Sequence, residues 1–134
     1  MWQTDFSYFK IKRWGTYYMG SVLDDFSRFI IAWDLLPNMK ADDARGTIDK
    51  AVLNSGVSPN QMPKLLSDNG SCYIAKEFRA YLKEMGIKQI NGAPCHPQTQ
   101  GKIERYHRTM KNVVLLDNYY TPEELRKAIA QFIH

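Results

Sequence analysis

The chain has 134 residues, of which 44% are hydrophobic and 13% aromatic, and this is enough for one domain with its own core. It contains no apolar run of the roughly 20 residues that cross a bilayer, and its first residues lack the basic and apolar regions of a secretory signal. The formal net charge of +4 is modest, but the basic residues that gather between 102 and 111 around a single acid suit a polyanionic partner as well as a solvated helix face. Two cysteines with 22 residues between them favour neither a disulfide framework nor a zinc site.

The first third of the chain predicts three antiparallel strands. Residues 2–9 alternate between two faces, and Asp5 lies in the middle of this apolar segment. Residues 16–23 and 28–35 are rich in strand-forming side chains, and the polar residues 24–27 connect them. We therefore expect a meander of three strands at the start of the fold.

The remaining residues predict helices that alternate with short strands. Apolar residues recur at helical spacing before Gly56 and again before Gly86, and each glycine is expected to end its helix. The sequence Thr121-Pro122-Glu123-Glu124 is a capping box that opens the last helix. The expected elements are helices over 41–52, 78–85, about 99–116 and from 122 onward, and strands over 64–67 and 87–90. Strands separated by helices favour parallel pairing, so we expect an α/β fold with a mixed five-stranded sheet.

Two carboxylates stand out because each lies on an apolar strand. Asp5 is in the first strand and Asp68 directly follows the strand at 64–67, at the end where open sheets of this class place ligands. Two neighbouring carboxylates repel each other, and a divalent cation relieves the repulsion. On spacing alone, a metal site and ordinary surface acids both stay open. Most of the other aspartates are expected at the surface or in turns, and these others are Asp24, Asp25, Asp34, Asp42, Asp43, Asp49 and Asp117.

The helix at 99–116 offers a third acid together with basic residues. Its predicted apolar stripe consists of Ile103, Tyr106, Met110, Val113 and Val114. Its other face is predicted to carry Glu104, His107, Arg108 and Lys111, which follow one another at helical spacing. A carboxylate beside two cations suits phosphodiester chemistry, because acids hold metals and bases hold phosphates.

Four segments resemble one known family. They are Trp2-Gln3-Thr4-Asp5-Phe6, Val22-Leu23-Asp24-Asp25-Phe26-Ser27-Arg28, Leu66-Ser67-Asp68-Asn69-Gly70 and residues 97–105, Pro-Gln-Thr-Gln-Gly-Lys-Ile-Glu-Arg. The chain resembles the retroviral-integrase-like catalytic core of DDE transposases. Within that family, it most resembles the bacterial insertion-sequence transposases of the IS3 group. The 35 residues between Asp68 and Glu104 match the D-D-35-E spacing of that family.

The resemblance implies an RNase H-like fold and assigns roles to individual residues. Asp5, Asp68 and Glu104 become the catalytic, metal-binding triad, and two Mg²⁺ ions per active site are implied, with Mn²⁺ as a substitute. Residues implied to contact DNA are Gln100 in the active-site loop, Lys102, Arg108 and Lys111. Asp25, Ser27 and Arg28 match a signature of structural rather than catalytic character.

The implied activity is nicking of DNA by water, followed by attack of the freed 3′-hydroxyl on target DNA. The implied partners are element ends and target DNA, and a homodimer or higher oligomer, in the cytoplasm of a bacterium at the nucleoid and away from membranes. Residues 1–134 are expected to be an excised catalytic core, without the helix-turn-helix region upstream and the remainder downstream, so DNA binding should be weak and poorly sequence-selective. Two alternatives stay open: a ribonuclease H-type nuclease, and a non-catalytic DNA-binding or assembly module.

Overall fold

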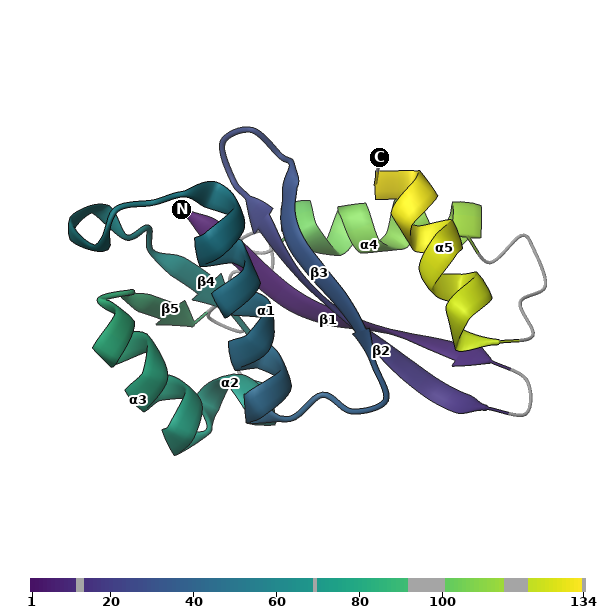
Figure 1. Cartoon of the computed structure of the whole chain (residues 1–134), viewed down its shortest axis with the longest axis horizontal. Helices are drawn as coiled ribbons and strands as arrows, with labels where there is room; N and C mark the ends of the chain where they lie inside the picture. The colour runs from purple at the N-terminus through teal and green to yellow at the C-terminus, as the bar shows by residue number, and fades with distance from the viewer. Residues whose placement is uncertain (12–13, 69, 92–100, 115–120, 134) are drawn as a thin grey trace.

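The structure is a computed structural model that describes residues 1–11, 14–68, 70–91, 101–114 and 121–133. In these ranges the chain forms one five-stranded sheet with helices on both faces (Figure 1). The strands are β1 (Trp2–Ile11), β2 (Gly15–Asp24), β3 (Ile30–Leu36), β4 (Leu65–Ser67) and β5 (Gln89–Asn91). The helices are α1 (Ala41–Ser55), the short 3-10 helix η1 (Pro59–Gln61), α2 (Ser71–Ile74), α3 (Lys76–Met85), α4 (Gly101–Val114) and α5 (Pro122–Ile133). No helix among the described residues is both long and apolar enough to span a membrane.

The strand order across the sheet is β3-β2-β1-β4-β5, so β1 lies in the centre. The first three strands pair antiparallel, whereas β1 with β4 and β4 with β5 pair parallel. This confirms the predicted mixed sheet. The glycines expected to end helices also do so, since Gly56 and Gly86 follow α1 and α3 with positive φ angles of 67° and 78°.

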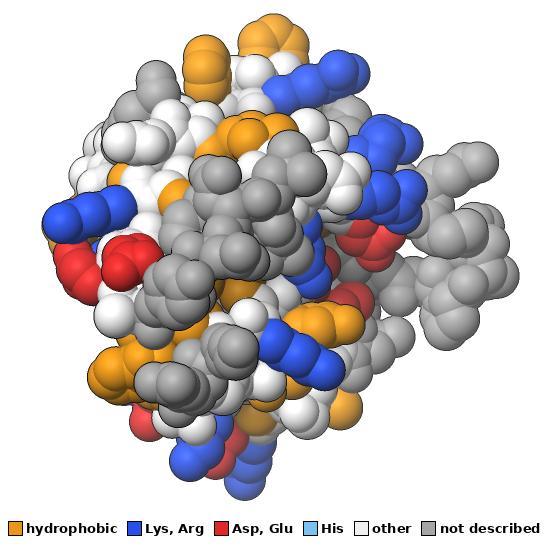
Figure 2. Space-filling view, turned by 90° about the vertical axis from the view of Figure 1, so that its right-hand side faces the viewer, with side chains coloured by type: hydrophobic (Ala, Val, Ile, Leu, Met, Phe, Trp, Pro, Cys, Tyr) orange, Lys and Arg blue, Asp and Glu red, His pale blue; other side chains and the backbone are white. Residues whose placement is uncertain are grey.

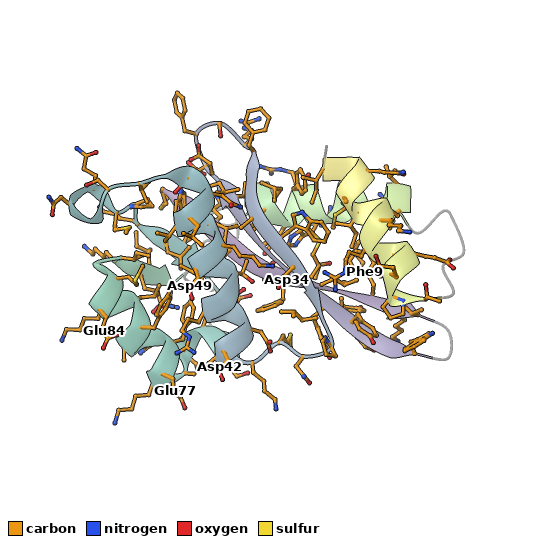
Figure 3. All side chains as sticks on the ribbon, in the orientation of Figure 1. Phe9, Asp34, Asp42, Asp49, Glu77 and Glu84 are labelled. Atoms are coloured by element: carbon orange, nitrogen blue, oxygen red, sulfur yellow. The ribbon has the colours of Figure 1, made fainter. Side chains whose placement is uncertain are left out.

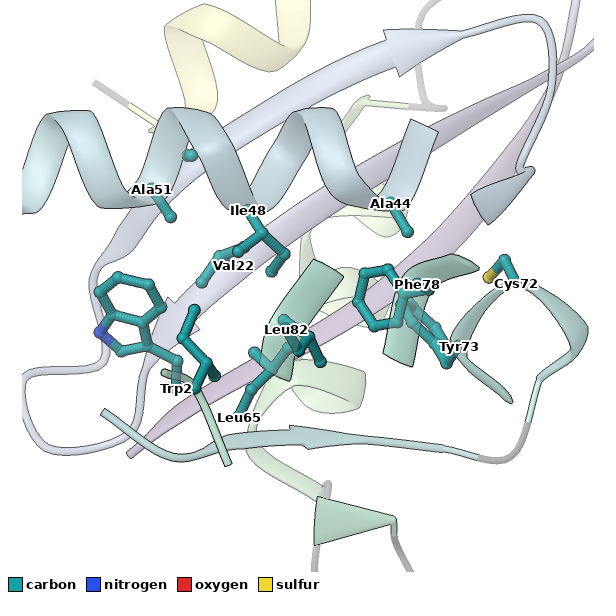
Figure 4. Packing of buried hydrophobic residues seen from close by; sticks show 12 residues of the cluster. Trp2, Val22, Ala44, Ile48, Ala51, Leu65, Cys72, Tyr73, Phe78 and Leu82 are labelled. Atoms are coloured by element: carbon teal, nitrogen blue, oxygen red, sulfur yellow. The ribbon is translucent and has the colours of Figure 1, made fainter. Parts of the chain in front are cut away.

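One face of the sheet is covered by α1, α2 and α3 (Figure 4). Ile48 of α1 lies over Val22 of β2, and Leu82 of α3 belongs to the same buried cluster. Burial of each such side chain stabilises the fold by roughly 1.5–3 kcal/mol. These three helices therefore cover one face of the sheet, and the opposite face is left for α4 and α5.

The opposite face of the sheet packs against α4 and α5, because alternate side chains of each strand point to this face. Phe9 of β1, Met110 of α4 and Leu125 of α5 share a second buried cluster. Two residues of α4 differ from the predicted pattern. Val113 is 50% exposed, although it was expected in the apolar stripe, and His107 is only 4% exposed, although it was expected on the polar face. The buried face of α4 is therefore rotated from the predicted apolar stripe, so that it includes His107 and excludes Val113.

Gly20 in the middle of β2 lies against an aromatic ring, and we expect substitution there to destabilise the fold. A Cβ atom at this position would lie 2.7 Å from the Phe6 ring and 3.0 Å from Thr47 Oγ1. The Phe6 ring is held by stacking on Tyr73, with ring centroids 6.0 Å apart. Gly20→Ala should therefore lower the free energy of unfolding by about 1–3 kcal/mol, measured by urea denaturation.

The matched control for this change is Gly46→Ala, in the interior of α1. A Cβ atom at Gly46 meets nothing within 4 Å, so alanine should stabilise that helix by roughly 0.5–1 kcal/mol. Equal effects of the two substitutions would contradict the steric explanation for Gly20.

Candidate active site

Asp5 and Asp68 lie side by side at the boundary between the antiparallel and parallel strands. β1 and β4 pair Trp2 with Leu65 and Gln3 with Leu66, which is an offset of 63 residues. The same offset continued along the chain sets Asp5 beside Asp68, the residue that follows β4. The proximity predicted from two apolar strands is thus a consequence of their register.

The backbone after β4 fixes the position of Asp68. Its Oδ1 accepts a hydrogen bond of 2.7 Å from the Gly70 amide, which closes a tight turn. Its backbone carbonyl accepts a hydrogen bond of 3.2 Å from the Asn91 side chain at the end of β5. The turn at Gly70 and strand β5 therefore hold Asp68 at the carboxyl end of β4.

Glu104 lies in the first turn of α4, and two polar contacts anchor this helix on the sheet. The Ile103 amide donates a hydrogen bond of 3.2 Å to Oε1 of Gln3, two residues before Asp5 on β1. One turn further along α4, His107 Nε2 and Ser21 Oγ share a hydrogen bond of 2.5 Å, and Ser21 is the cross-strand partner of Asp5. The anchors lie on both sides of Glu104 along the helix, so they set its position relative to Asp5.

Neither Gln3 nor Ser21 was identified as a site residue from the sequence. Both are polar side chains with 2% or less of their surface exposed. A buried polar side chain requires hydrogen-bond partners. Gln3 donates to Asp25 directly after the neighbouring strand, 22 residues away, but the α4 partners lie 100 residues away for Gln3 and 86 residues away for Ser21. The sequence signal that could have identified them is a polar residue at a strand position where the pattern predicts a buried side chain.

Burial and the neighbouring carboxylates both disfavour the charged form of Asp5. Burial raises the pKa of Asp5 to about 7, and the charge of Asp68, the charge of Glu104 and a hydrogen bond to Asp68 add to that rise, whereas the Phe6 amide opposes it. The same charges reach α2, because burial together with Asp68 and Asp5 raises the pKa of the Cys72 thiol to about 11. The electrostatic field at this edge of the sheet is thus negative and favours a cation.

Basic side chains of α4 line the same region. A hollow of about 410 Å³ is bordered by Asp5, Phe6, Ser7, Glu104, His107, Arg108, Lys111 and Asn112. The ammonium of Lys111 lies 4.1 Å from the centre of the Tyr8 ring, which orients the cation by a cation–π contact. Arg108 and Lys111 therefore border the same hollow as Asp5 and Glu104, and their contact with phosphates stays a prediction. Gln100 and the side chain of Lys102 lie outside the described residues.

His107 lines the hollow as a neutral group rather than as a cation. Burial, and then the charge of Lys111, lowers its pKa to about 4. Its contribution is to hold α4 on β2 through Ser21, and the cations of this face are Arg108 and Lys111.

The remaining described aspartates have ordinary structural roles. Asp34 on β3 pairs with Lys50 at 2.9 Å, and Asp24 accepts a hydrogen bond of 2.7 Å from the Ser27 hydroxyl within a turn. Asp42 and Asp49 lie on α1, in the helical layer that covers the other face of the sheet (Figure 3). Asp117 lies outside the described residues. Asp24 in its turn and the exposed Asp42 agree with the surface or turn assignments, whereas Asp34 lies within β3 with 22% of its side chain exposed.

The donor set fits a divalent cation that keeps part of its water shell. Within the described ranges, no three Asp, Glu, His or Cys side chains are grouped closely enough to hold a metal ion by themselves. Mg²⁺ is commonly bound by one or two carboxylates together with substrate phosphates, and the Asp5–Asp68 pair near Glu104 supplies such carboxylates. The raised pKa of Asp5 reflects burial first and repulsion by Asp68 and Glu104 second, and a bound cation would offset both by favouring the charged carboxylate.

Comparison with known protein families identifies integrase cores along the whole chain. The family model described as "Integrase core domain" matches residues 1–97, and a second model with the same description matches residues 85–134. The Gag-Pro-Pol polyprotein of squirrel monkey retrovirus is 30% identical over 92 residues, which are 69% of this chain and 5% of the polyprotein. The Gag-Pol polyprotein of woolly monkey sarcoma virus is 30% identical over 114 residues, which are 84% of this chain and 6% of the polyprotein. The chain thus spans a small part of the curated relatives that it matches.

Solved structures share the fold at lower sequence identity. The magnesium complex of the HTLV-2 integrase catalytic core domain, in its trimeric form, superposes with a TM-score of 0.75 and 22% identity over 98% of this chain and 80% of that chain. A chain of the simian T-cell lymphotropic virus intasome, in complex with a PP2A regulatory subunit, superposes with a TM-score of 0.79 and 22% identity over 96% of this chain and 46% of that chain. The fold predicted from the sequence is therefore confirmed.

Proposed function

Because this chain belongs to the integrase core domain family, we propose that it is the catalytic core of a DNA transposase or integrase that performs metal-dependent phosphoryl transfer. The observation that carries the proposal is the pairing of Asp5 with Asp68 by strand register, with Glu104 close enough to raise the pKa of Asp5. Perturbed carboxylates beside basic side chains are typical of sites that handle phosphates.

In this proposal Asp5, Asp68 and Glu104 hold two Mg²⁺ ions, with Mn²⁺ as a substitute. When bound, such ions activate the attacking oxygen and stabilise the charge on the leaving oxygen of a phosphodiester. Arg108 and Lys111 bind the flanking DNA phosphates, because they border the same hollow. Gln3, Ser21 and His107 hold α4 on the sheet and so keep Glu104 in place.

The proposed substrate is DNA, first nicked at the end of an element and then joined to target DNA through the freed 3′-hydroxyl. Joining two ends requires at least two active sites, so a homodimer or higher oligomer is part of the proposal. The cytoplasmic, nucleoid-associated location expected from the sequence belongs to the same proposal.

The test is a nicking assay on end-labelled DNA duplexes. We expect single-strand cleavage with Mn²⁺ or Mg²⁺, and background cleavage with Ca²⁺ or EDTA. A matched RNA–DNA hybrid serves as the second substrate, because a ribonuclease H-type enzyme would cleave its RNA strand in preference. Cleavage restricted to the hybrid would replace the proposal by the ribonuclease, and DNA binding without any cleavage would replace it by the non-catalytic module.

A further inference from the structure

A second hollow lies on the other flank of α4 and does not belong to the acidic site. It measures about 290 Å³ and is lined by Leu23, Arg28, Arg105, Tyr106, Thr109 and Phe132. These residues come from β2, the β2–β3 turn, α4 and α5. The hollow therefore forms only where these four segments meet.

The chemistry of its lining combines two guanidinium groups with aromatic walls. Among the described residues, the ion pairs involve Arg45, Lys50 and Arg126, and neither Arg28 nor Arg105 is paired with an acid. Tyr106 and Phe132 meet edge to face with ring centroids 5.7 Å apart. Hydrophobic and basic side chains also lie next to each other at the top of the surface shown in Figure 2. Tyr106 and Phe132 are partly exposed, and arginine beside accessible aromatic rings is the combination that binds phosphates and stacks bases of single-stranded nucleic acid.

The turn that carries Arg28 holds the backbone of this residue in an unusual conformation. Arg28 has a φ of 63°, a left-handed conformation that is unfavourable for a residue with a Cβ atom. Its amide donates a hydrogen bond of 2.8 Å to the Asp24 carbonyl, and the Asp24 carboxylate accepts a hydrogen bond from Ser27. Asp25, the acid nearest to Arg28 in sequence, accepts a hydrogen bond of 2.7 Å from the Gln3 side chain. Both acids of the turn are thus engaged with other residues. The same turn carries two largely exposed aromatic rings, Phe26 at 94% and Phe29 at 74% exposure.

Helix geometry connects this second hollow to the acidic site. Glu104 and Arg108 border the acidic hollow, whereas Arg105 and Thr109 border the second one. Successive residues of an α-helix point about 100° apart, so the two hollows lie on opposite flanks of α4, separated by a helix of roughly 10–12 Å diameter. Arg105 and Arg108 are neighbours on the exposed side between them. A DNA strand that crosses α4 from the acidic site would meet Arg108, then Arg105, and then the second hollow.

We propose that the second hollow binds one unpaired nucleotide of the DNA strand, with its phosphate between Arg28 and Arg105 and its base against Tyr106 and Phe132. The inference rests on the function proposed above, since it takes that enzyme's substrate as its ligand. Binding by charge and stacking is tolerant of sequence. The site would therefore favour frayed or single-stranded DNA ends over blunt duplex, whatever their sequence.

The test compares the affinity for a blunt duplex with that for the same duplex carrying a four-nucleotide single-stranded overhang. Fluorescence anisotropy is measured over a salt series with Ca²⁺, so that cleavage does not interfere. We expect the wild type to bind the overhang substrate about tenfold more tightly. The variant Arg28→Gly/Arg105→Gln should lose that preference, with a salt slope lower by about one unit for the lost phosphate contact. Glycine accepts the positive φ at position 28, so this change removes the side chain without adding strain.

The matched control removes two charges from the opposite helical layer, in the variant Arg79→Gln/Lys83→Gln on α3, where both residues are exposed. It should keep the preference for the overhang. Photo-cross-linking of wild type to an overhang that carries 5-iododeoxyuridine should modify a peptide containing Tyr106 or Phe132, which tests the site without any substitution.

Three results would overturn the inference. They are equal binding of both substrates by wild type, equal losses in the two double variants, and cross-links confined to other peptides. A change of oligomeric state in Arg28→Gly/Arg105→Gln with unchanged DNA affinity would assign the hollow to a protein contact instead. Failure of wild type to nick DNA in Mn²⁺, with the overhang preference intact, would count against the proposed activity and leave the nucleotide site standing.

Discussion

Asp5→Asn, Asp68→Asn and Glu104→Gln are each expected to reduce metal-dependent nicking by at least about a thousandfold. Each change keeps the shape of the side chain but removes a charge that would hold the metal ions. Because the removed charges repel one another in the absence of metal, the variants should remain folded. Nicking rates are measured under single-turnover conditions, and folding is checked by circular dichroism.

The control for these variants is Asp42→Asn on α1, whose side chain is 84% exposed and is paired only with the neighbouring Arg45 among the described residues. It should nick DNA at the wild-type rate. If any one of the three variants kept more than about a tenth of the wild-type rate, the residue concerned would leave the proposed triad.

The second large effect concerns pH and metal together. Asp5 keeps its proton up to a pKa of about 7 in the folded protein, against a reference value of 3.8. Between these values the folded state binds more protons than the unfolded state, so this group makes stability fall as the pH rises. His107 acts in the opposite direction, because its folded pKa of about 4 lies below its reference value of 6.5. Its contribution is present above pH 6.5 and is lost as the pH falls toward 4.

The two groups should therefore oppose each other between pH 4 and 6.5, and Asp5 alone should lower stability between pH 6.5 and about 8. In metal-free buffer at pH 8, Asp5→Asn should be more stable than wild type, by a few kcal/mol at most. Adding Mg²⁺ or Mn²⁺ at pH 8 should reverse this order, because a ligand that binds only the folded state stabilises it by mass action. Urea denaturation at pH 5, 6.5 and 8, with EDTA or with metal, measures both effects. Equal metal shifts in wild type and Asp5→Asn would place the bound ions elsewhere.

Much of the fold follows from local sequence patterns. The helix-ending glycines and the Thr121 cap were predicted, and the Glu124 amide does donate a hydrogen bond of 3.2 Å to the Thr121 hydroxyl. The short helices η1 and α2 were not predicted, because segments of three or four residues carry too little periodicity. Local pattern thus suffices for long elements and fails for short ones.

The site was only partly accessible from the sequence. Asp5 and Asp68 could be singled out because carboxylates on apolar strands are costly, but the offset that sets them side by side is a property of the folded sheet. His107 was assigned to the polar face because histidine is a polar residue type. Its burial depends on the Ser21 hydroxyl of β2, and the sequence of α4 alone cannot reveal this partner. The second hollow requires Arg28 and Arg105, which only the fold brings together.

The unequal lengths of the strand pairings have a consequence for local stability. β1 and β2 pair over ten residues, whereas β1 and β4 pair over two, and β4 and β5 over three. The antiparallel strands can therefore stay intact as one cooperative unit while β4 and β5 detach transiently as another, since native proteins open in such units with different free energies. Asp5 belongs to the first unit and Asp68 to the second. Each such opening would take the paired carboxylates apart, so an ion or a DNA phosphate held between them would also fasten the two folding units together.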